Sequence, residues 1–191
     1  MKNMFHTLLF SLLCSSAVAA NPDITCTISV KNAVVRQGQS PQVKVAIKNR
    51  SDKEIVLVKS LDASDCGWRY PKCGFVVTRA DRKPLPHWSF GRCGNMNLLR
   101  ATDFVRVGAG KDFAPLGKGY MGSTMFRIRN LPPGAYLLKF YYQTSTKGVE
   151  AYFGDERMMK NWKVSPEIQE LYAGVPELNL WSNELKFTIR R

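Results

Sequence analysis

Residues 131–142 read LPPGAYLLKFYY. Two prolines followed by Gly134 are typical of a tight turn, because proline fixes its backbone φ angle and glycine accepts almost any. After the turn, every second residue from Tyr136 to Tyr142 is apolar or aromatic. Successive side chains of a β-strand point to opposite faces, so this period of two predicts a strand with one buried face.

The same alternation recurs in the rest of the chain and predicts seven or eight short strands. The clearest candidates are Ile24–Val30, Val43–Ile47, Ile55–Val58, Phe104–Val107, Thr124–Arg129 and Leu185–Arg191. Turn residues separate these segments, as at Asn49–Lys53, where Asn, Ser and Asp side chains can bond the local backbone. The pattern favours an all-β fold, an antiparallel immunoglobulin-like β-sandwich. A small closed barrel is the alternative.

One long connection, residues 147–179, interrupts the alternation. Within it, Ser165 suits a helix N-cap, Pro166 the first helical position and Gly174 the helix end. We therefore expect one short helix in the connection before the last strand. Connections of this length are often functional, and the alternative is that this one covers an open edge of the sheet.

The N-terminus, residues 1–20, has the pattern of a cleaved export signal. Lys2 supplies the positive start, Leu8–Leu13 the apolar stretch, and the small residues up to Ala20 the cleavage site. This stretch is too short to span a bilayer, and no later stretch is long enough. The expected mature protein is one domain, residues 21–191, that is periplasmic or secreted.

The mature chain has four cysteines, and an even number in an oxidising compartment predicts two disulfides. Three pairings are possible. The preferred one joins Cys66 to Cys73 as a local clip and Cys26 to Cys93, which ties the first strand to the end of an insertion over residues 66–93. A zinc site built from the four thiolates is the alternative, but no C-x-x-C pair supports it.

The insertion between Cys66 and Cys93 is the candidate binding segment, because aromatic and basic side chains alternate in it. Such side chains dominate the energetics of protein interfaces. The candidate binding residues are Trp68, Arg69, Tyr70, Lys72, His87, Trp88, Phe90 and Arg92. The alternative is that the two tryptophans seal the open end of the sandwich core while the basic residues hydrate its rim.

The net charge of the chain is +13, which favours acidic partners or anionic surfaces. Without Lys2 of the leader the charge is +12. No block of five like charges exists, so the sequence predicts no nucleic-acid-binding tail. Besides a protein partner, the charge allows an anionic envelope polymer, a glycan or a membrane surface as ligand.

The sequence shows no catalytic apparatus. His87 is the only histidine outside the leader, so neither a metallopeptidase HExxH helix nor a histidine pair is present. No G-x-S-x-G elbow supports a serine hydrolase, which is the least favoured alternative. Asp62 and Asp65 lack the glycine-centred loop of a calcium site, and we expect no metal or cofactor.

Several segments together resemble a known type of domain. They are NRSDKEIVLVKSLD from Asn49, FVVTRADRKPL from Phe75, FVRVGAGK from Phe104, LPPGAYLLKF from Leu131 and SNELKFTI from Ser182. The pattern resembles the immunoglobulin-like domain that precedes the catalytic domain of deuterolysin-type and peptidyl-Lys metallopeptidases, and bacterial inhibitor-like domains of the same sandwich type. No catalytic domain follows, so the resemblance implies an inhibitor-like or accessory role. The expected function is an exported, non-catalytic module that binds another protein.

Overall fold

The computed structural model describes residues 23–83, 85, 97–116, 124, 127–153 and 163–191. This part of the chain is mostly β, so the prediction of an all-β class is confirmed at that level. The strands are β1 (Ile24–Val30), β2 (Val34–Arg36), β3 (Val43–Asn49), β4 (Ile55–Val58), β5 (Lys72–Arg79), β6 (Phe104–Val107), β7 (Asp112–Phe113), β8 (Gly134–Gln143), β9 (Asn179–Trp181) and β10 (Leu185–Arg190).

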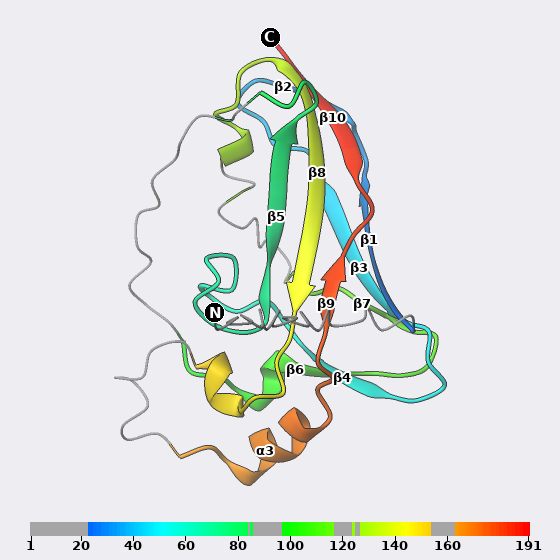
Figure 1. Ribbon diagram of the computed structural model, residues 1–191, viewed down its shortest axis with the longest axis vertical. Helices are drawn as coiled ribbons and strands as arrows, with labels where there is room; N and C mark the ends of the chain where they lie inside the picture. The colour runs from blue at the N-terminus through cyan, green and yellow to red at the C-terminus, as the bar shows by residue number, and fades with distance from the viewer. Residues whose placement is uncertain (1–22, 84, 86–96, 117–123, 125–126, 154–162) are drawn as a thin grey trace, which may run out of the picture.

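The strands form two facing sheets and a short two-stranded one (Figure 1). One sheet has the order β1-β3-β7. The other has the order β2-β10-β8-β5, with β9 paired to the end of β8. Strands β4 and β6 pair with each other. All pairings are antiparallel except that of β2 with β10, which is parallel.

The main core lies between the two larger sheets, and β8 supplies its centre. The four alternate residues predicted to share one face of this strand are fully buried: Tyr136, Leu138, Phe140 and Tyr142. They pack against inward-facing residues of β1 and β3 such as Ile28 and Ile47. Burial of an apolar side chain of this size stabilises the fold by roughly 1.5–3 kcal/mol, so the period of two in this strand fixes its orientation.

A second apolar cluster lies under β4 and β6, where helix α3 (Pro166–Ala173) covers it. Ile168 of the helix belongs to this cluster, together with Val56 and Phe104. The predicted helix is confirmed at both ends. Ser165 is the N-cap, whose hydroxyl accepts from the backbone N–H of Ile168 at 3.3 Å, and Gly174 is the C-cap.

Tyr142 joins the two clusters. Its hydroxyl donates to the carbonyl oxygen of Val58 at 2.8 Å and accepts from the N–H of the same residue at 3.1 Å. Because Tyr142 lies on β8 and Val58 on β4, one side chain fixes the small sheet against the large one. Burial raises the pKa of Tyr142, which therefore stays protonated and able to donate.

The predicted turn at Asn49–Lys53 is confirmed. Asn49 is fully buried, and its amide donates to the carbonyl oxygens of Lys53 at 2.7 Å and Val107 at 2.9 Å. Its side-chain oxygen accepts from both the N–H and the hydroxyl of Ser51. One amide side chain therefore holds the turn and attaches it to β6.

The prediction of a strand over Thr124–Arg129 is wrong. The described residues Thr124, Arg127 and Ile128 are helical. Ile128 and Leu131, which lie three residues apart, both enter the core, and this spacing puts them on one side of a helical turn. Thr124 also donates its hydroxyl to the carbonyl oxygen of Phe75, so this segment lies beside β5.

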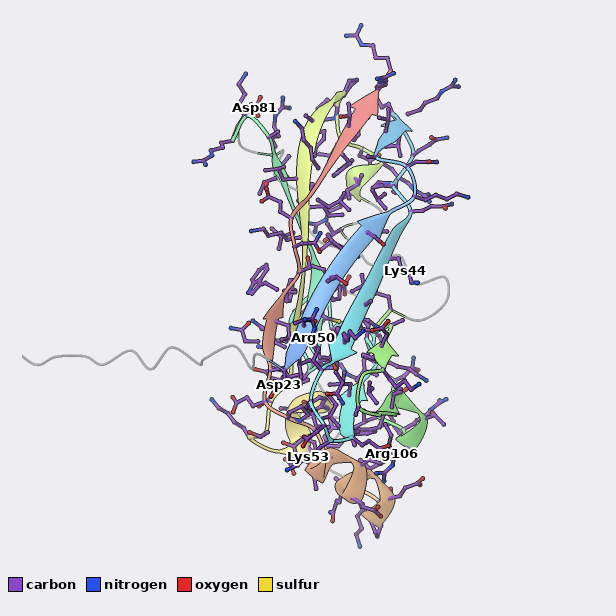
Figure 2. The ribbon with its side chains drawn as sticks, turned by 90° about the vertical axis from the view of Figure 1, so that its right-hand side faces the viewer. Asp23, Lys44, Arg50, Lys53, Asp81 and Arg106 are labelled. Carbon is purple, nitrogen blue, oxygen red and sulfur yellow. The ribbon has the colours of Figure 1, made fainter. Side chains whose placement is uncertain are left out.

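The two ends of the molecule differ in character. Figure 2 shows Asp81 at one end, and Arg106 near α3 at the other. Arg106 pairs there with Glu54 at 3.3 Å and with Glu170 of the helix at 3.4 Å.

None of the helices within the described residues has the length and apolar character needed to cross a membrane.

Candidate functional site

The segment from the end of β4 to the start of β5 carries four of the eight predicted binding residues. The other four, His87, Trp88, Phe90 and Arg92, lie outside the described residues. Several backbone hydrogen bonds hold the loop, and two of them involve predicted binding residues. The N–H of Trp68 donates to the carbonyl oxygen of Ala63, and that of Tyr70 donates to Ala151. The second bond attaches the loop to the long connection before the last strand.

The four described residues have different surroundings. Trp68 is 46% exposed, so this tryptophan does not seal the core. Tyr70 packs on Tyr152 with ring centroids 5.7 Å apart, and the ammonium nitrogen of Lys72 lies 4.9 Å from the centre of the Tyr70 ring. Arg69 is fully buried. The predicted surface is therefore divided: Trp68 faces solvent and Arg69 does not.

The predicted disulfide between Cys66 and Cys73 is absent, and the insertion is not braced as expected. Cys73 is a free thiol that points into the core. Asp65, which precedes Cys66, lies on the other side of the strand, since a Cβ added at Gly74 would lie 3.6 Å from the Cα of Asp65. Neighbouring residues of a strand face opposite sides, so Cys66, next to Asp65, and Cys73 lie on different faces of β5.

The predicted Cys26–Cys93 disulfide is also wrong, because Cys26 is a free thiol in the same core. Cys93 lies outside the described residues. Burial raises the pKa of Cys26 and of Cys73 to about 12. Both side chains are therefore protonated at neutral pH and act as small apolar residues.

Arg69 is the most unusual residue of the loop, with 1% of its surface exposed. Its Nη1 donates to the carbonyl oxygen of Asn97 at 2.7 Å. Its Nε and Nη2 are buried, and neither has an acceptor among the residues that the structure describes. Burial lowers the pKa of Arg69, while Asp62 and Asp103 oppose this shift. A guanidinium stays charged even so, which leaves a buried cation with two unused donor atoms.

Arg69 lines a cavity of about 200 Å³, the Arg69 pocket. The other lining residues are Ser60, Leu61, Asp62, Asn97, Leu98, Arg100 and Asp103. A second cavity of about 520 Å³ shares Asn97, Leu98 and Arg100 with the pocket, and extends to Lys163 and Ser165 at the start of α3. The shared residues make the two cavities neighbours along one wall.

The two carboxylates of the pocket hold its wall in place. Asp62 accepts from the backbone N–H of Asn97, and Asp103 accepts from that of Arg100 at 2.8 Å. Neither forms an ion pair with Arg69 within the described structure. They therefore lower the electrostatic cost of the buried cation without occupying its free nitrogens.

The outer face of the large sheet carries an aromatic pair that the sequence analysis missed. Trp181 of β9 is 52% exposed, and its ring centroid lies 5.6 Å from that of Tyr141 on β8. In β5, Gly74 lies opposite Tyr141 and Val76 is exposed. The alternation of β9, with Leu180 buried between exposed neighbours, is the signal that predicts the outward position of Trp181. We call Val76, Tyr141 and Trp181 the aromatic surface.

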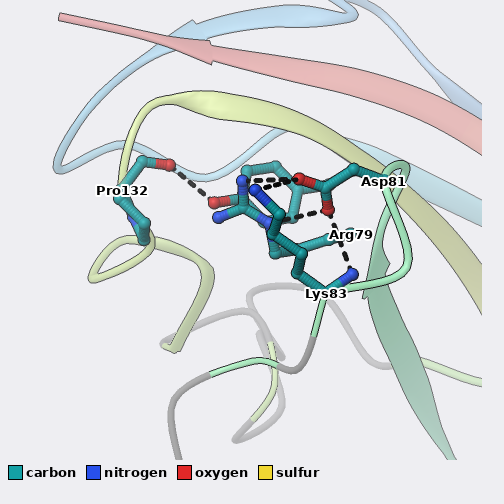
Figure 3. A network of polar contacts seen from close by, with 5 residues as sticks. Arg79, Asp81, Lys83 and Pro132 are labelled. Atoms are coloured by element: carbon teal, nitrogen blue, oxygen red, sulfur yellow. Dashed lines mark hydrogen bonds and ion pairs between the residues drawn. The ribbon is translucent and has the colours of Figure 1, made fainter.

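A basic corner lies at the other end of β5 (Figure 3). Asp81 accepts from Arg79 Nε at 2.9 Å and Nη2 at 3.1 Å, and its other ion pair is with Lys83 at 3.9 Å. Arg79, Arg82 and Lys83 line a cavity of about 620 Å³ together with Glu184. Asp81 therefore offsets part of the positive charge of this corner, whereas Glu184 pairs with Lys139 of β8 at 3.7 Å.

Comparison with models of known protein families and with curated protein sequences gives no match for this chain. The resemblance to immunoglobulin-like domains of metallopeptidases therefore stays a prediction. Three groups of described residues bear on function: the exposed Trp68 with the aromatic surface, the Arg69 pocket, and the basic corner.

Proposed function

We propose that this protein is an exported, non-catalytic immunoglobulin-like module that recognises another protein. One observation carries the proposal. Trp68 and Trp181 are each about half exposed, 46% and 52%, and Trp181 stands on an ordered strand. Large aromatic side chains held in place on a rigid scaffold bury much area on binding at a small cost in conformational entropy.

The loop of Trp68 adjoins the aromatic surface. The backbone of Asp65 packs over Gly74, and the Tyr141 ring lies 3.4 Å from the position of a Cβ at that glycine. Tyr141 in turn contacts Trp181. The backbone of the loop and the two aromatic rings are thus neighbours on the same side of the sheet, and their aromatic side chains are of the type enriched at interface centres.

Two features support an immunoglobulin-like arrangement. The main core lies between two facing sheets, as in a sandwich. The hydroxyl of Tyr136, near the start of β8, donates to the carbonyl oxygen of Pro132 at 2.6 Å. A tyrosine that bonds back to the backbone a few residues upstream is the tyrosine corner of immunoglobulin-like domains.

Export of the protein and a non-catalytic role are proposed from the sequence alone. Residues 1–20 have the pattern of an export signal and lie outside the described residues. Only one histidine, His87, follows the leader, which leaves no histidine pair for catalysis. The expected role is accessory or inhibitor-like. Sandwich folds serve many functions, so the surface residues carry this proposal rather than the fold.

Exchange of either exposed tryptophan for alanine tests the proposal. Tagged protein is used to capture partners from the periplasmic and extracellular fractions of its own host, and the captured proteins are quantified by mass spectrometry. Trp68→Ala and Trp181→Ala should each lower the yield of the same partner about tenfold, the effect of a 1.4 kcal/mol loss. The melting temperature should hardly change, because both side chains are exposed.

Val34→Ala is the control, since Val34 is an exposed apolar residue on β2, away from the aromatic surface. It should leave capture unchanged. Equal recovery by wild type and both tryptophan variants would contradict the proposal. So would unfolding of the Trp68 and Trp181 variants, because it would show that these residues serve stability.

A second candidate function is binding of an anionic envelope polymer, glycan or membrane surface, and the basic corner favours it. Arg82 and Lys83 are exposed there, and the whole chain carries a charge of +13. Asp81 weakens this candidate by pairing with Arg79 and Lys83. The two functions differ in their response to salt.

A further inference from the structure

We propose that the Arg69 pocket binds a carboxylate group of the partner, through the Nε and Nη2 of Arg69. This inference rests on the proposed function, to which it adds the chemistry of the group that is recognised. These two nitrogens are buried donors, and neither has an acceptor in the described part of the chain. A buried donor left without an acceptor costs about 1–3 kcal/mol, and more when it is charged.

The free atoms of Arg69 lie along one edge of the guanidinium. Nη1 is already committed to the carbonyl oxygen of Asn97, which fixes the plane of the group. Nε and Nη2 are the two nitrogens that donate in parallel, and their spacing matches the two oxygens of a carboxylate. The free edge of Arg69 therefore favours a planar, two-oxygen acceptor over a single water or carbonyl oxygen.

The volume of the pocket agrees with this ligand. At about 200 Å³ it is several times the roughly 30 Å³ that one water occupies in the liquid. It has room for a carboxylate with the carbon atoms next to it. Nε and Nη2 themselves are covered in this structure, so the carboxylate must displace the side chains that cover them. The adjoining cavity, lined by the exposed Leu98 and by Ile168, offers an apolar wall for whatever follows the carboxylate.

The charges of the lining also agree. Among the described lining residues of the two cavities, the cations are Arg69, Arg100 and Lys163, and the anions are Asp62 and Asp103. Three positive and two negative charges leave one net positive charge. One carboxylate neutralises it, whereas a dianionic phosphate would leave an excess negative charge beside two aspartates.

The carboxylate can come from an Asp or Glu side chain of the partner or from its C-terminus, and three peptides separate these sources. The first is acetyl-Gly-Leu-Glu-Gly-amide. The second is acetyl-Gly-Gly-Gly-Leu with a free C-terminal carboxylate. The third, acetyl-Gly-Leu-Gln-Gly-amide, is the uncharged control. Each is titrated into the ¹⁵N-labelled protein while the Arg69 Nε–H resonance is followed by NMR.

We expect the Arg69 Nε–H signal to shift saturably with at least one of the two acidic peptides and not with the glutamine peptide. Arg69→Lys identifies the resonance by its disappearance. Because lysine keeps the charge and loses the paired donors, this variant should also weaken binding roughly tenfold or more. Arg36→Lys, at an exposed arginine of β2 that lines neither cavity, is the matched control and should leave the affinity unchanged.

Leu98→Glu keeps the test decisive if Arg69→Lys does not fold. Leu98 is exposed and lines both cavities, so a glutamate there should fold normally and compete with or repel the acidic peptide. Lower affinity at an unchanged melting temperature supports the site. The inference is overturned if neither acidic peptide moves the Arg69 signal, or if the glutamine peptide moves it equally.

The two proposals fail separately. If the tryptophan variants lose the partner while no carboxylate affects Arg69, the pocket inference falls and the binding function stands. If Arg69 responds to a carboxylate while both tryptophan variants capture the partner normally, the protein surface proposed for recognition is wrong. The pocket is then a carboxylate site in its own right.

Discussion

At the scale of single residues, the carboxylate of Asp81 accepts hydrogen bonds from the Arg79 side chain and from the backbone N–H of Lys83. The hydrogen bond from Arg79, with a second from the backbone N–H of Lys83, lowers the pKa of Asp81 from its ordinary value of 3.8 to about 2. The folded state therefore binds a proton less readily than the unfolded state does. The stabilisation is complete above about pH 4 and is lost as the pH falls toward 2.

Asp81→Asn should make the free energy of unfolding less dependent on pH between about pH 4 and 2. The measurement is urea denaturation at several pH values, with wild type in parallel. Above pH 5 the variant should be slightly less stable, because the ion pair is exposed and contributes little. Curves that stay parallel for the two proteins between pH 4 and 2 would show that Asp81 does not carry this stabilisation.

Arg69 shows what local sequence leaves undetermined. Its neighbours Trp68 and Tyr70 made it a candidate for a binding loop, yet Trp68 is exposed in the structure whereas Arg69 is buried. The burial of Arg69 depends on Asn97 and Asp103, which lie some thirty residues away and approach it only in the folded chain. No spacing within the loop encodes that contact.

At the scale of elements, the hydroxyl of Tyr142 connects β8 to β4. Tyr142→Phe should lower the free energy of unfolding by about 1–3 kcal/mol, because it leaves the buried N–H and carbonyl oxygen of Val58 without a partner. Tyr136→Phe, which removes one partly buried bond to Pro132, is the matched control and should cost about 1 kcal/mol. Chemical denaturation measures both, and an equal or smaller loss for Tyr142 would contradict its role as a connection.

Elements with a strong local signal were predictable. The strand from Gly134 to Gln143, the turn closed by Asn49, and helix α3 with its Ser165 cap all follow from side-chain period or capping chemistry. The segment Thr124–Arg129 was not, because its alternation is short and the pair Ile128 and Leu131 fits a helical turn equally well. The cysteine pairing failed for another reason: counting thiols says nothing about which face of a strand each one occupies.

At the scale of the whole molecule, the net charge of +13 matters for binding. Because of this charge, the two candidate functions should differ in how strongly salt weakens binding. Binding to an anionic polymer or membrane through the basic corner should weaken steeply between 50 and 300 mM salt, as exposed charges are screened over about 8 Å at physiological ionic strength. Binding of a protein partner through Trp68 and Trp181 should change much less. Sedimentation with anionic lipid vesicles, compared with partner capture at the same salt concentrations, measures the difference. A capture that collapses with salt would favour the basic corner.

Strand β5 is the last strand of the large sheet, and other parts of the chain bond to its outer edge near the start of the strand. The N–H of Cys73 donates to the carbonyl oxygen of Ser64, and the carbonyl oxygen of Phe75 accepts from the hydroxyl of Thr124. Unpaired strand edges are templates on which a second chain can add and aggregate. Ser64, in the loop that presents Trp68, and Thr124 therefore occupy two positions at which a neighbouring copy could otherwise add to the sheet. The same loop thus has two effects: it presents an exposed tryptophan, and it protects part of the strand edge beside it.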